Sequence, residues 1–268
     1  MSAAPKLSMT TQFQREPLRE ITYGPLESRR FGVTLGVNIF GAKKYCSFDC
    51  SYCDLGRTEN RLNQMKDDPE LPRLNQIVDG VRAALEKLHA TGPRFDSILI
   101  SGNGEPSLHP DFPEIVSDLM KLKTAWANDK KLIVLTNGSG LDNRKIIEAM
   151  NRLDERIVKL DAGNEKMFKI FASPLSRTNL TKVISGSRSL KDFAVQSMFC
   201  QGAIDNTGAT DVDDWIEVIG MLKPKAVHIQ GLSRTPALAG LIRCDEDTLH
   251  MIASRLERRT GLKAIITP

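Results

Sequence analysis

The stretch FGVTLGVNIFGAKKYCSFDCSYC, residues 31–53, combines a predicted strand with a cluster of thiols. Apolar residues alternate through positions 31–39, which is the pattern of a half-buried β-strand. Three of the five cysteines, Cys46, Cys50 and Cys53, follow within eight residues. Thiolates are soft ligands that bind zinc or iron–sulfur clusters. We therefore expect a metal-binding loop at the carboxyl end of this strand.

Regular secondary structure continues on the C-terminal side of the cysteines. Short β runs alternate with amphipathic helical segments, which indicates βαβ units and a mostly parallel sheet. An open doubly wound sheet and an incomplete barrel both fit this alternation, and both place their chemistry at the carboxyl ends of the strands. The predicted strands are 97–101, 132–136, 156–161, 193–199, 226–230 and, near the end of the chain, 263–267. The predicted helices are 74–89, 111–127, 142–153, 211–222 and 245–259.

Length and composition favour one globular domain. The chain has 268 residues, 41% of them hydrophobic and 26% charged, and no linker rich in Pro, Gly and Ser divides it. Residues 1–22 are polar and show no periodicity, so we predict an N-terminal arm (1–22) followed by one α/β domain (23–268). No run of about 18 apolar residues is present, and the N-terminal residues lack the apolar region of a secretory signal. We expect a cytoplasmic protein that has no membrane partner.

Polar residues follow two of the predicted strands. Gly102, Gly104 and Glu105 come directly after strand 97–101. The glycines permit a close backbone approach, and the carboxylate can either pair with a cationic amine or cap a turn. Asn137 follows the next strand and fits either a binding role or an ordinary Asn-Gly turn.

Alternate residues on three later strands share one face. Lys159 and Asp161 lie together on the first, Gln196 and Cys200 on the second, and His228 on the third. A lysine and a carboxylate on an interior face indicate a polar binding lumen. A salt-bridged strand end and a hydrogen-bonded structural histidine are the alternative interpretations.

The spacing of the cysteines resembles the signature of the radical S-adenosylmethionine (radical SAM) superfamily. That signature is CX3CXΦC, where Φ is aromatic, and Tyr52 occupies the aromatic position. The sequence Gly102-Asn103-Gly104-Glu105 is similar to the GGE-type motif of the same family, with Asn103 where many members have glycine. The resemblance extends over residues 23–230.

This resemblance implies a fold, two cofactors and a set of site residues. The fold is a partial (β/α)6 barrel of the TIM-like, radical SAM type. The cofactors are one [4Fe–4S] cluster and SAM, which is cleaved reductively to a 5′-deoxyadenosyl radical that abstracts hydrogen from substrate. The expected cluster ligands are Cys46, Cys50 and Cys53. The residues expected to contact SAM are Tyr52, Gly102, Asn103, Gly104, Glu105, Asn137, Gln196 and His228. Those expected at the reacting centre are Lys159, Asp161 and Cys200.

Residues 23–38, 159–163 and 234–236 resemble a narrower group, the radical SAM relatives of the wyosine-synthesis enzyme, which modifies tRNA. That enzyme uses a second cluster held by additional upstream cysteines, and no cysteine precedes Cys46 here. We therefore expect a single-cluster enzyme, with tRNA base modification as the first hypothesis and tRNA as its partner. A reductant protein such as a flavodoxin or ferredoxin would supply the electrons.

Two other functions fit the cysteine spacing. A glycyl-radical-enzyme activating protein shares this spacing and a small barrel, and it would act on a protein loop. A non-catalytic zinc-binding module would complete its ligands with Cys200, Cys244 or a histidine. Basic residues also cluster in sequence around the loop, where they contact RNA phosphates, tune the potential of a cluster, recruit an acidic electron donor or are simply solvated. They are Arg29, Arg30, Lys43, Lys44, Arg57 and Arg61.

Overall fold

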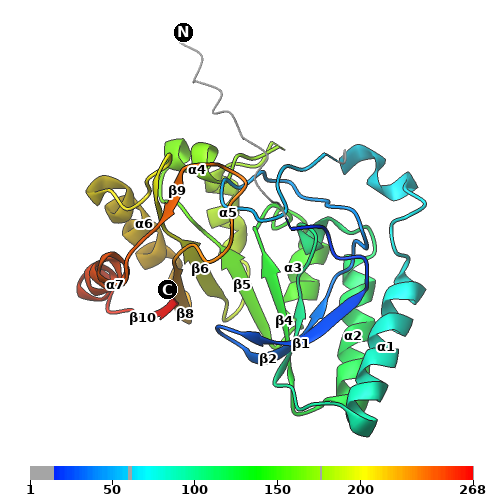
Figure 1. The fold of residues 1–268 in the computed structure, drawn as a ribbon. Helices are drawn as coiled ribbons and strands as arrows, with labels where there is room; N and C mark the ends of the chain where they lie inside the picture. Colours follow the sequence, from blue (N-terminus) through cyan, green and yellow to red (C-terminus); the bar gives the residue numbers. More distant parts are fainter. Residues whose placement is uncertain (1–14, 60–61, 176, 268) are drawn as a thin grey trace.

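A curled, eight-stranded sheet organises the chain (Figure 1). The computed structural model describes residues 15–59, 62–175 and 177–267. The strand order is β1-β2-β3-β4-β5-β6-β8-β10; β1 is antiparallel to β2 and every later neighbour pair is parallel. The strands are β1 (Thr22–Ser28), β2 (Gly32–Val37), β3 (Ser97–Ile100), β4 (Lys131–Thr136), β5 (Glu155–Lys159), β6 (Ala194–Met198), β8 (Ala226–Gln230) and β10 (Ala264–Thr267).

Helices cover the outer face of this sheet, as parallel βαβ crossovers require (Figure 1). Ile77, Val81 and Leu85 of α1 are at most 1% exposed, because residues four apart share the face that packs on the sheet. This half-barrel confirms the predicted partial barrel. Among the described residues, no helix is both long and apolar enough to cross a membrane. The helices are α1 (Leu74–Thr91), α2 (Phe112–Trp126), α3 (Arg144–Met150), α4 (Glu165–Phe171), α5 (Leu180–Ser187), α6 (Ala209–Leu222) and α7 (Glu246–Thr260).

The alternation of predicted strands and helices is present with shifted ends, and three further strands were not predicted. β1 contains Gly24-Pro25, which is a turn signal, and a bulge between Tyr23 and Leu26 lets the strand stay paired with β2. β7 (Cys200–Gly202) and β9 (Leu241–Arg243) form a separate antiparallel pair that is too short to show periodicity. The division into arm and domain stays a prediction, because residues 1–14 lie outside the described residues.

The interior of the half-barrel changes character along its axis. Toward the amino ends of the strands, Ile133, Ile157 and Ala194 form a small apolar cluster against which Phe31 packs. Polar side chains occupy the same interior face nearer the carboxyl ends. The apolar cluster therefore forms a floor, and the carboxyl ends are left as the place for chemistry.

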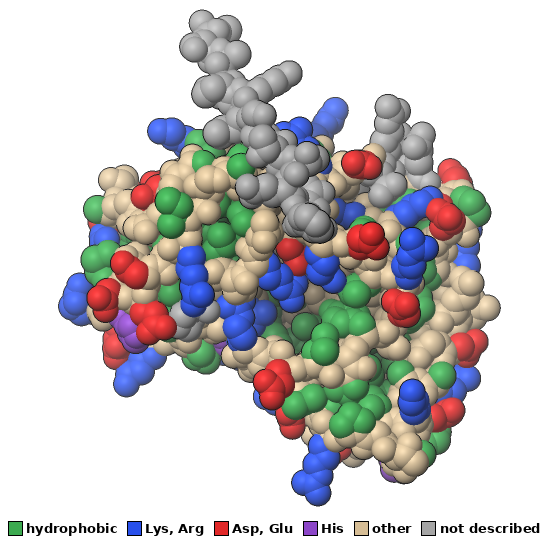
Figure 2. All heavy atoms as spheres, in the orientation of Figure 1, with side chains coloured by type: hydrophobic (Ala, Val, Ile, Leu, Met, Phe, Trp, Pro, Cys, Tyr) green, Lys and Arg blue, Asp and Glu red, His purple; other side chains and the backbone are tan. Residues whose placement is uncertain are grey.

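The interior is open on one side because β1 and β10, the two edges of the sheet, do not pair with each other. Ile265 of β10 pairs with His228 of β8 and is 52% exposed. Figure 2 shows the molecular surface in the orientation of Figure 1. Lys and Arg side chains gather near the centre of this view, beside a hollow that exposes hydrophobic side chains. A ligand can therefore reach the interior from the side.

Candidate active site

Backbone hydrogen bonds fix the cysteine loop to segments that are distant in sequence. The Asp49 N–H donates to the carbonyl of Ser173 (3.0 Å), and the Ser51 N–H donates to that of Phe171 (2.9 Å). The Leu238 N–H donates to the carbonyl of Ser51 (3.0 Å). The loop is therefore held between the end of α4 and the segment that follows β8.

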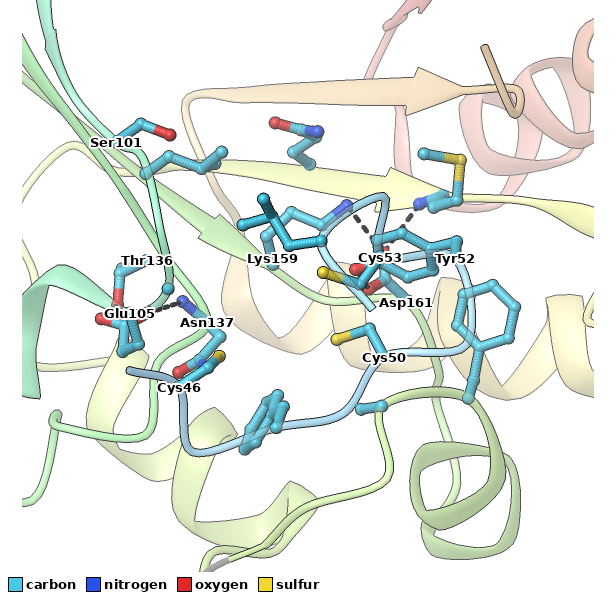
Figure 3. Close-up of a pocket in the computed structure, with 18 of the residues that line it drawn as sticks. Cys46, Cys50, Tyr52, Cys53, Ser101, Glu105, Thr136, Asn137, Lys159 and Asp161 are labelled. Carbon is cyan, nitrogen blue, oxygen red and sulfur yellow. Dashed lines mark hydrogen bonds and ion pairs between the residues drawn. The ribbon is translucent and has the colours of Figure 1, made fainter. Parts of the chain in front are cut away.

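The side chains of Cys46, Cys50 and Cys53 line one cavity (Figure 3), and none is in a disulfide. Burial raises the pKa of Cys46 to about 12 and that of Cys50 well above its usual value, so these thiols need a bound cation to become thiolates. Within the described part of the chain, no three His, Cys, Asp or Glu side chains converge as ligands of a single metal ion do. Three thiolates are one fewer than the four ligands of a structural zinc site, and thiolate is the ligand type that iron–sulfur clusters take.

Glu105 lies across this cavity from Cys50 and Cys53, and its side chain is 2% exposed. Its Oε1 accepts hydrogen bonds from the hydroxyls of Thr136 (2.7 Å) and Ser107 (2.6 Å) and from the Ser107 N–H (3.1 Å). Its Oε2 accepts from the Asn137 N–H (2.6 Å). Burial raises the pKa of Glu105, while these four bonds favour the ionised form. The carboxylate is thus fixed in place before any ligand arrives.

Gly104 brings the cysteine loop against the carboxyl end of β3. Its φ is +129°, and an added Cβ would lie 1.8 Å from the carbonyl oxygen of Tyr45. The Glu105 N–H donates to that same carbonyl (2.9 Å). Only glycine fits this position, so the glycine of the motif couples the loop to the buried carboxylate.

Tyr52 connects the loop to the interior of the barrel. Its hydroxyl donates to Asp161 Oδ2 (2.6 Å), and its ring packs 5.2 Å from that of Phe171. Lys159 Nζ lies 3.0 Å from Asp161 Oδ1 and 5.0 Å from the centre of the Tyr52 ring. Asp161 Oδ1 also accepts from the Met198 N–H (2.7 Å). The structure therefore brings Lys159 and Asp161 together beside the aromatic residue of the cysteine motif.

These groups surround a cavity of about 230 Å³ at the carboxyl ends of β3 to β6. Phe48, Phe168 and Phe171 form the apolar part of its wall, and Phe171 packs against Tyr52. This combination suits a ligand that has a charged end and an apolar or aromatic body. The predicted site residues that line the cavity are Cys46, Cys50, Tyr52, Cys53, Gly102, Gly104, Glu105, Asn137, Lys159, Asp161 and Gln196.

Three predicted site residues lie outside this lining. The Asn103 side chain is fully buried and donates to the carbonyls of Leu18 and Gly41, so it anchors the N-terminal segment. Cys200 is 0% exposed in a separate apolar cluster, and burial raises the pKa of its thiol to about 12. His228 lies on β8, one strand beyond the cavity. These three side chains therefore do not line the cavity.

Sequence reasoning missed the apolar wall and an ionic contact beside the loop. Phe168 lies on α4, a helix of only 7 residues. Asp54 forms ion pairs with Arg15 Nε (3.1 Å) and Arg234 Nη1 (2.7 Å). A motif search that stops at Cys53 has no signal for either feature.

The basic residues that cluster in the sequence do not form one patch. The two lysines that precede the cysteines lie within ion-pair distance of carboxylates close to the loop, and Arg61 lies outside the described residues. Burial lowers the pKa of Arg29, and the nearby Arg234 and Arg243 lower it further. The β1–β2 turn and the C-terminal third of the chain thus contribute together to a group of arginines.

A half-barrel with three cysteines after its first parallel strand, and a buried carboxylate after the second, is the arrangement that the sequence predicts for a radical SAM protein. The sequence model of the radical SAM superfamily matches residues 43–198, which is more than half of the chain. The chain belongs to the radical SAM superfamily.

Comparison with known proteins agrees with this family. The chain is 31% identical to a UPF0026 protein of Helicobacter pylori over 166 residues, which cover 62% of this chain and 50% of the relative. It thus spans about half the length of that relative.

Two solved structures share the fold at a TM-score of 0.64 each and cover 87% of this chain. One is a radical SAM methyltransferase from Sphaerobacter thermophilus, with 17% identity and 65% of its own chain covered. The other is TYW1 with a lysine–pyruvate adduct bound, with 14% identity and 75% covered. At these identities the likeness concerns the fold alone.

Proposed function

We propose that this protein is a radical SAM enzyme that holds one [4Fe–4S] cluster on Cys46, Cys50 and Cys53. The observation that carries the proposal is the cavity that three unpaired cysteines share with the buried carboxylate of Glu105. Three protein thiolates leave one of four irons free to bind a small molecule. When bound, the cluster supplies one electron to SAM, whose reductive cleavage gives methionine and a 5′-deoxyadenosyl radical that abstracts hydrogen from substrate.

Glu105 is the residue that we assign to the amino group of SAM. Donors from Thr136, Ser107 and Asn137 hold both of its carboxylate oxygens. A cationic ammonium group placed beside this carboxylate would stabilise its ionised form, which burial disfavours. Because the carboxylate is already oriented, binding needs little rearrangement of the protein.

Lys159 and Asp161 are the residues that we place beside the reacting end of the ligand. Asp161 is oriented by the Tyr52 hydroxyl and the Met198 N–H. Lys159 Nζ is ion-paired but makes no well-directed hydrogen bond, so it can donate one to a ligand. Phe168 and the other aromatic residues of the apolar wall exclude water, which protects a reactive radical from side reactions.

We infer a tRNA base as the substrate and a flavodoxin or ferredoxin as the electron donor. The resemblance of residues 23–38 to the wyosine-synthesis relatives supports the first inference. The arginines at positions 29, 234 and 243 also support it, because they gather where a phosphate backbone could be contacted. Binding of tRNA that weakens steeply with added salt is the expected result. A tight complex with a large partner enzyme would instead favour a glycyl-radical activating role.

Anaerobic reconstitution with iron and sulfide, followed by dithionite and SAM, tests the enzyme proposal. We expect about four irons per chain and release of 5′-deoxyadenosine and methionine in equal amounts. Cys50→Ala should release neither product. Cys244→Ala removes a buried thiol outside the cavity and is the matched control. One zinc per chain with no 5′-deoxyadenosine would overturn the proposal in favour of a zinc-binding module.

A further inference from the structure

Neighbouring strands of the half-barrel carry a row of polar side chains across their interior face. In the parallel register, Lys159 of β5 is opposite Gln196 of β6, which is opposite His228 of β8. We call these three residues the interior polar row. Gln196 and His228 are 4% and 7% exposed. The row begins in the cavity of the cysteines and runs toward the open edge of the sheet at β10.

Buried polar atoms along this row lack hydrogen-bond partners. Among the described residues, nine buried side-chain atoms have no partner, and six of them lie here. Folded proteins leave few such atoms unpaired, so a concentration of them along one row marks a place where bound water or a ligand completes the hydrogen bonding. The six are Lys159 Nζ, Gln196 Oε1, His228 Nδ1, Gln230 Nε2, Arg30 Nε and Arg30 Nη1.

Arg30 brings a positive charge to the far end of the row. It lies in the β1–β2 turn, with its guanidinium 5.1 Å from the centre of the Phe31 ring, and that ring is 6.4 Å from the ring of His228. Burial and the adjacent Arg29 lower the pKa of Arg30 to about 10, and no carboxylate of the described residues offsets this. At neutral pH the side chain therefore stays charged without a counter-ion.

The unpaired atoms specify the chemistry of the ligand. Arg30 and Gln230 present only N–H donors at these atoms. Burial lowers the pKa of His228, and Arg30 lowers it further, so its neutral ring can complete a hydrogen bond without adding charge. A partly buried guanidinium near His228, with the Phe31 ring packed against both, favours an anionic acceptor, a carboxylate or a phosphate.

The geometry also relates this end of the row to the cysteine cavity. The row covers two strand spacings, about 10 Å in total. A molecule anchored beside Arg30 and His228 would therefore extend its other end toward Lys159 and the cavity.

We propose that Arg30 and His228 form an anion-binding subsite that anchors the carboxylate or phosphate of the substrate at the far end of the interior polar row. The subsite rests on the proposed function, because it turns the remainder of the substrate toward the place where the radical arises. It is separate from Glu105, which lies on the other side of the cysteine loop and serves a cation.

Anion binding to the purified protein tests this subsite without relying on turnover. Inorganic phosphate and acetate are titrated in separate arms at constant ionic strength, and the melting temperature reports binding. We expect a saturable rise with one of the two anions, which identifies the anionic group. Arg30→Gln should weaken the apparent affinity about tenfold or more, because a charge-assisted hydrogen bond is lost.

Two comparisons make this test decisive. Arg144→Gln removes a charge from a side chain that is 92% exposed and should keep the wild-type response. Arg30→Gln should raise the melting temperature of the anion-free protein, because a partly buried cation without a counter-ion is removed. A lower melting temperature, an unchanged anion response in Arg30→Gln, or no saturable response in the wild type overturns the subsite. SAM binding by the wild type is measured in parallel, and its absence would defeat the proposed function alone.

Discussion

The barrel interior beside the cysteine loop (the cysteine end) and the interior beside β8 (the β8 end) differ in how completely their buried polar groups are hydrogen-bonded. At the cysteine end, Glu105 receives four hydrogen bonds, and Asp161 is held by a tyrosine, a lysine and a backbone N–H. At the β8 end, Arg30, His228 and Gln230 leave buried atoms unpaired. Lys159 Nζ is ion-paired with Asp161 but makes no hydrogen bond, whereas the carboxylates at the cysteine end are satisfied, and a satisfied network is rigid and keeps one geometry. The cysteine end is therefore built into the fold, whereas the β8 end is completed only by what binds there.

The largest expected effect comes from breaking the rigid end at Gly104. Gly104→Ala places a methyl group against the Tyr45 carbonyl at a φ that disfavours side chains, so we expect the loop to lose its shape and reconstituted iron to fall to background. Gly261→Ala is the control: its φ is +74°, but no atom lies within 4 Å of the added Cβ. It should lower stability by about 1 kcal/mol and keep full iron content. Normal iron binding in Gly104→Ala would contradict this rigidity.

The second effect separates cofactor affinity from cluster assembly. Glu105→Gln removes the negative charge and turns an amide NH2 toward N–H and O–H donors that the carboxylate now accepts. We expect SAM to bind about tenfold or more weakly, with iron content unchanged. Equilibrium dialysis with labelled SAM measures the affinity. Glu114→Gln, at an exposed position of α2, is the matched control. Equal SAM affinity in the two variants would remove Glu105 from the site.

A smaller effect is expected from the hydroxyl of Tyr52. Tyr52→Phe keeps the ring but leaves Asp161 Oδ2 without its 2.6 Å donor, which should lower the free energy of unfolding by about 1–2 kcal/mol. Tyr23→Phe removes a longer hydrogen bond to a backbone carbonyl, 3.2 Å, and should have about half that effect or less. Urea denaturation measures both. If Tyr23→Phe is the more destabilising change, the Asp161 network is not the stronger one.

The smallest effect concerns the buried imidazole of His109, four residues after Glu105 in the sequence. His109 accepts from the Asp111 N–H at Nδ1, its Nε2 lies 3.0 Å from the Pro72 carbonyl, and burial lowers its pKa below 6.5. The unfolded chain therefore takes up a proton before the folded one does. This contribution to stability is complete above about pH 6.5 and is lost as the pH falls toward the folded-state value.

Unfolding measurements at about pH 7 and pH 5 test this sign. The free energy of unfolding of the wild type should be lower at about pH 5 than at pH 7. In His109→Gln this decrease should be smaller by about 1 kcal/mol or less. His250→Gln, at an exposed position, controls for the loss of an imidazole. A wild-type protein that gains stability toward pH 5 while His109→Gln does not would reverse the assignment.

The sequence predicts the parts of this molecule that depend on local pattern. Periodicity locates the parallel strands and their helices, and the spacing of Cys46, Cys50 and Cys53 predicts the loop that the structure places beside Glu105. These features are predictable because the carboxyl ends of parallel strands meet at one edge.

Features that depend on long-range packing could not be predicted. Arg30 is an ordinary basic residue in the sequence, and its partly buried position follows only from the way the β1–β2 turn packs near β8. Asn103 belongs to the glycine motif, yet its side-chain amide donates hydrogen bonds to the backbone carbonyls of Leu18 and Gly41 and not to a ligand site. Which of two adjacent residues faces the cavity is decided by backbone conformation, which a motif does not record.

The attachment points of the cysteine loop have a consequence for maturation. Its backbone is hydrogen-bonded to residues 171 and 173 and to residue 238, and Asp54 beside it is ion-paired with Arg15 and Arg234. A chain that has been synthesised only as far as the loop has none of the downstream contacts. The loop therefore acquires its shape late, after most of the polypeptide has been synthesised and folded. Iron delivered earlier would encounter three cysteines on a segment whose backbone is not yet fixed.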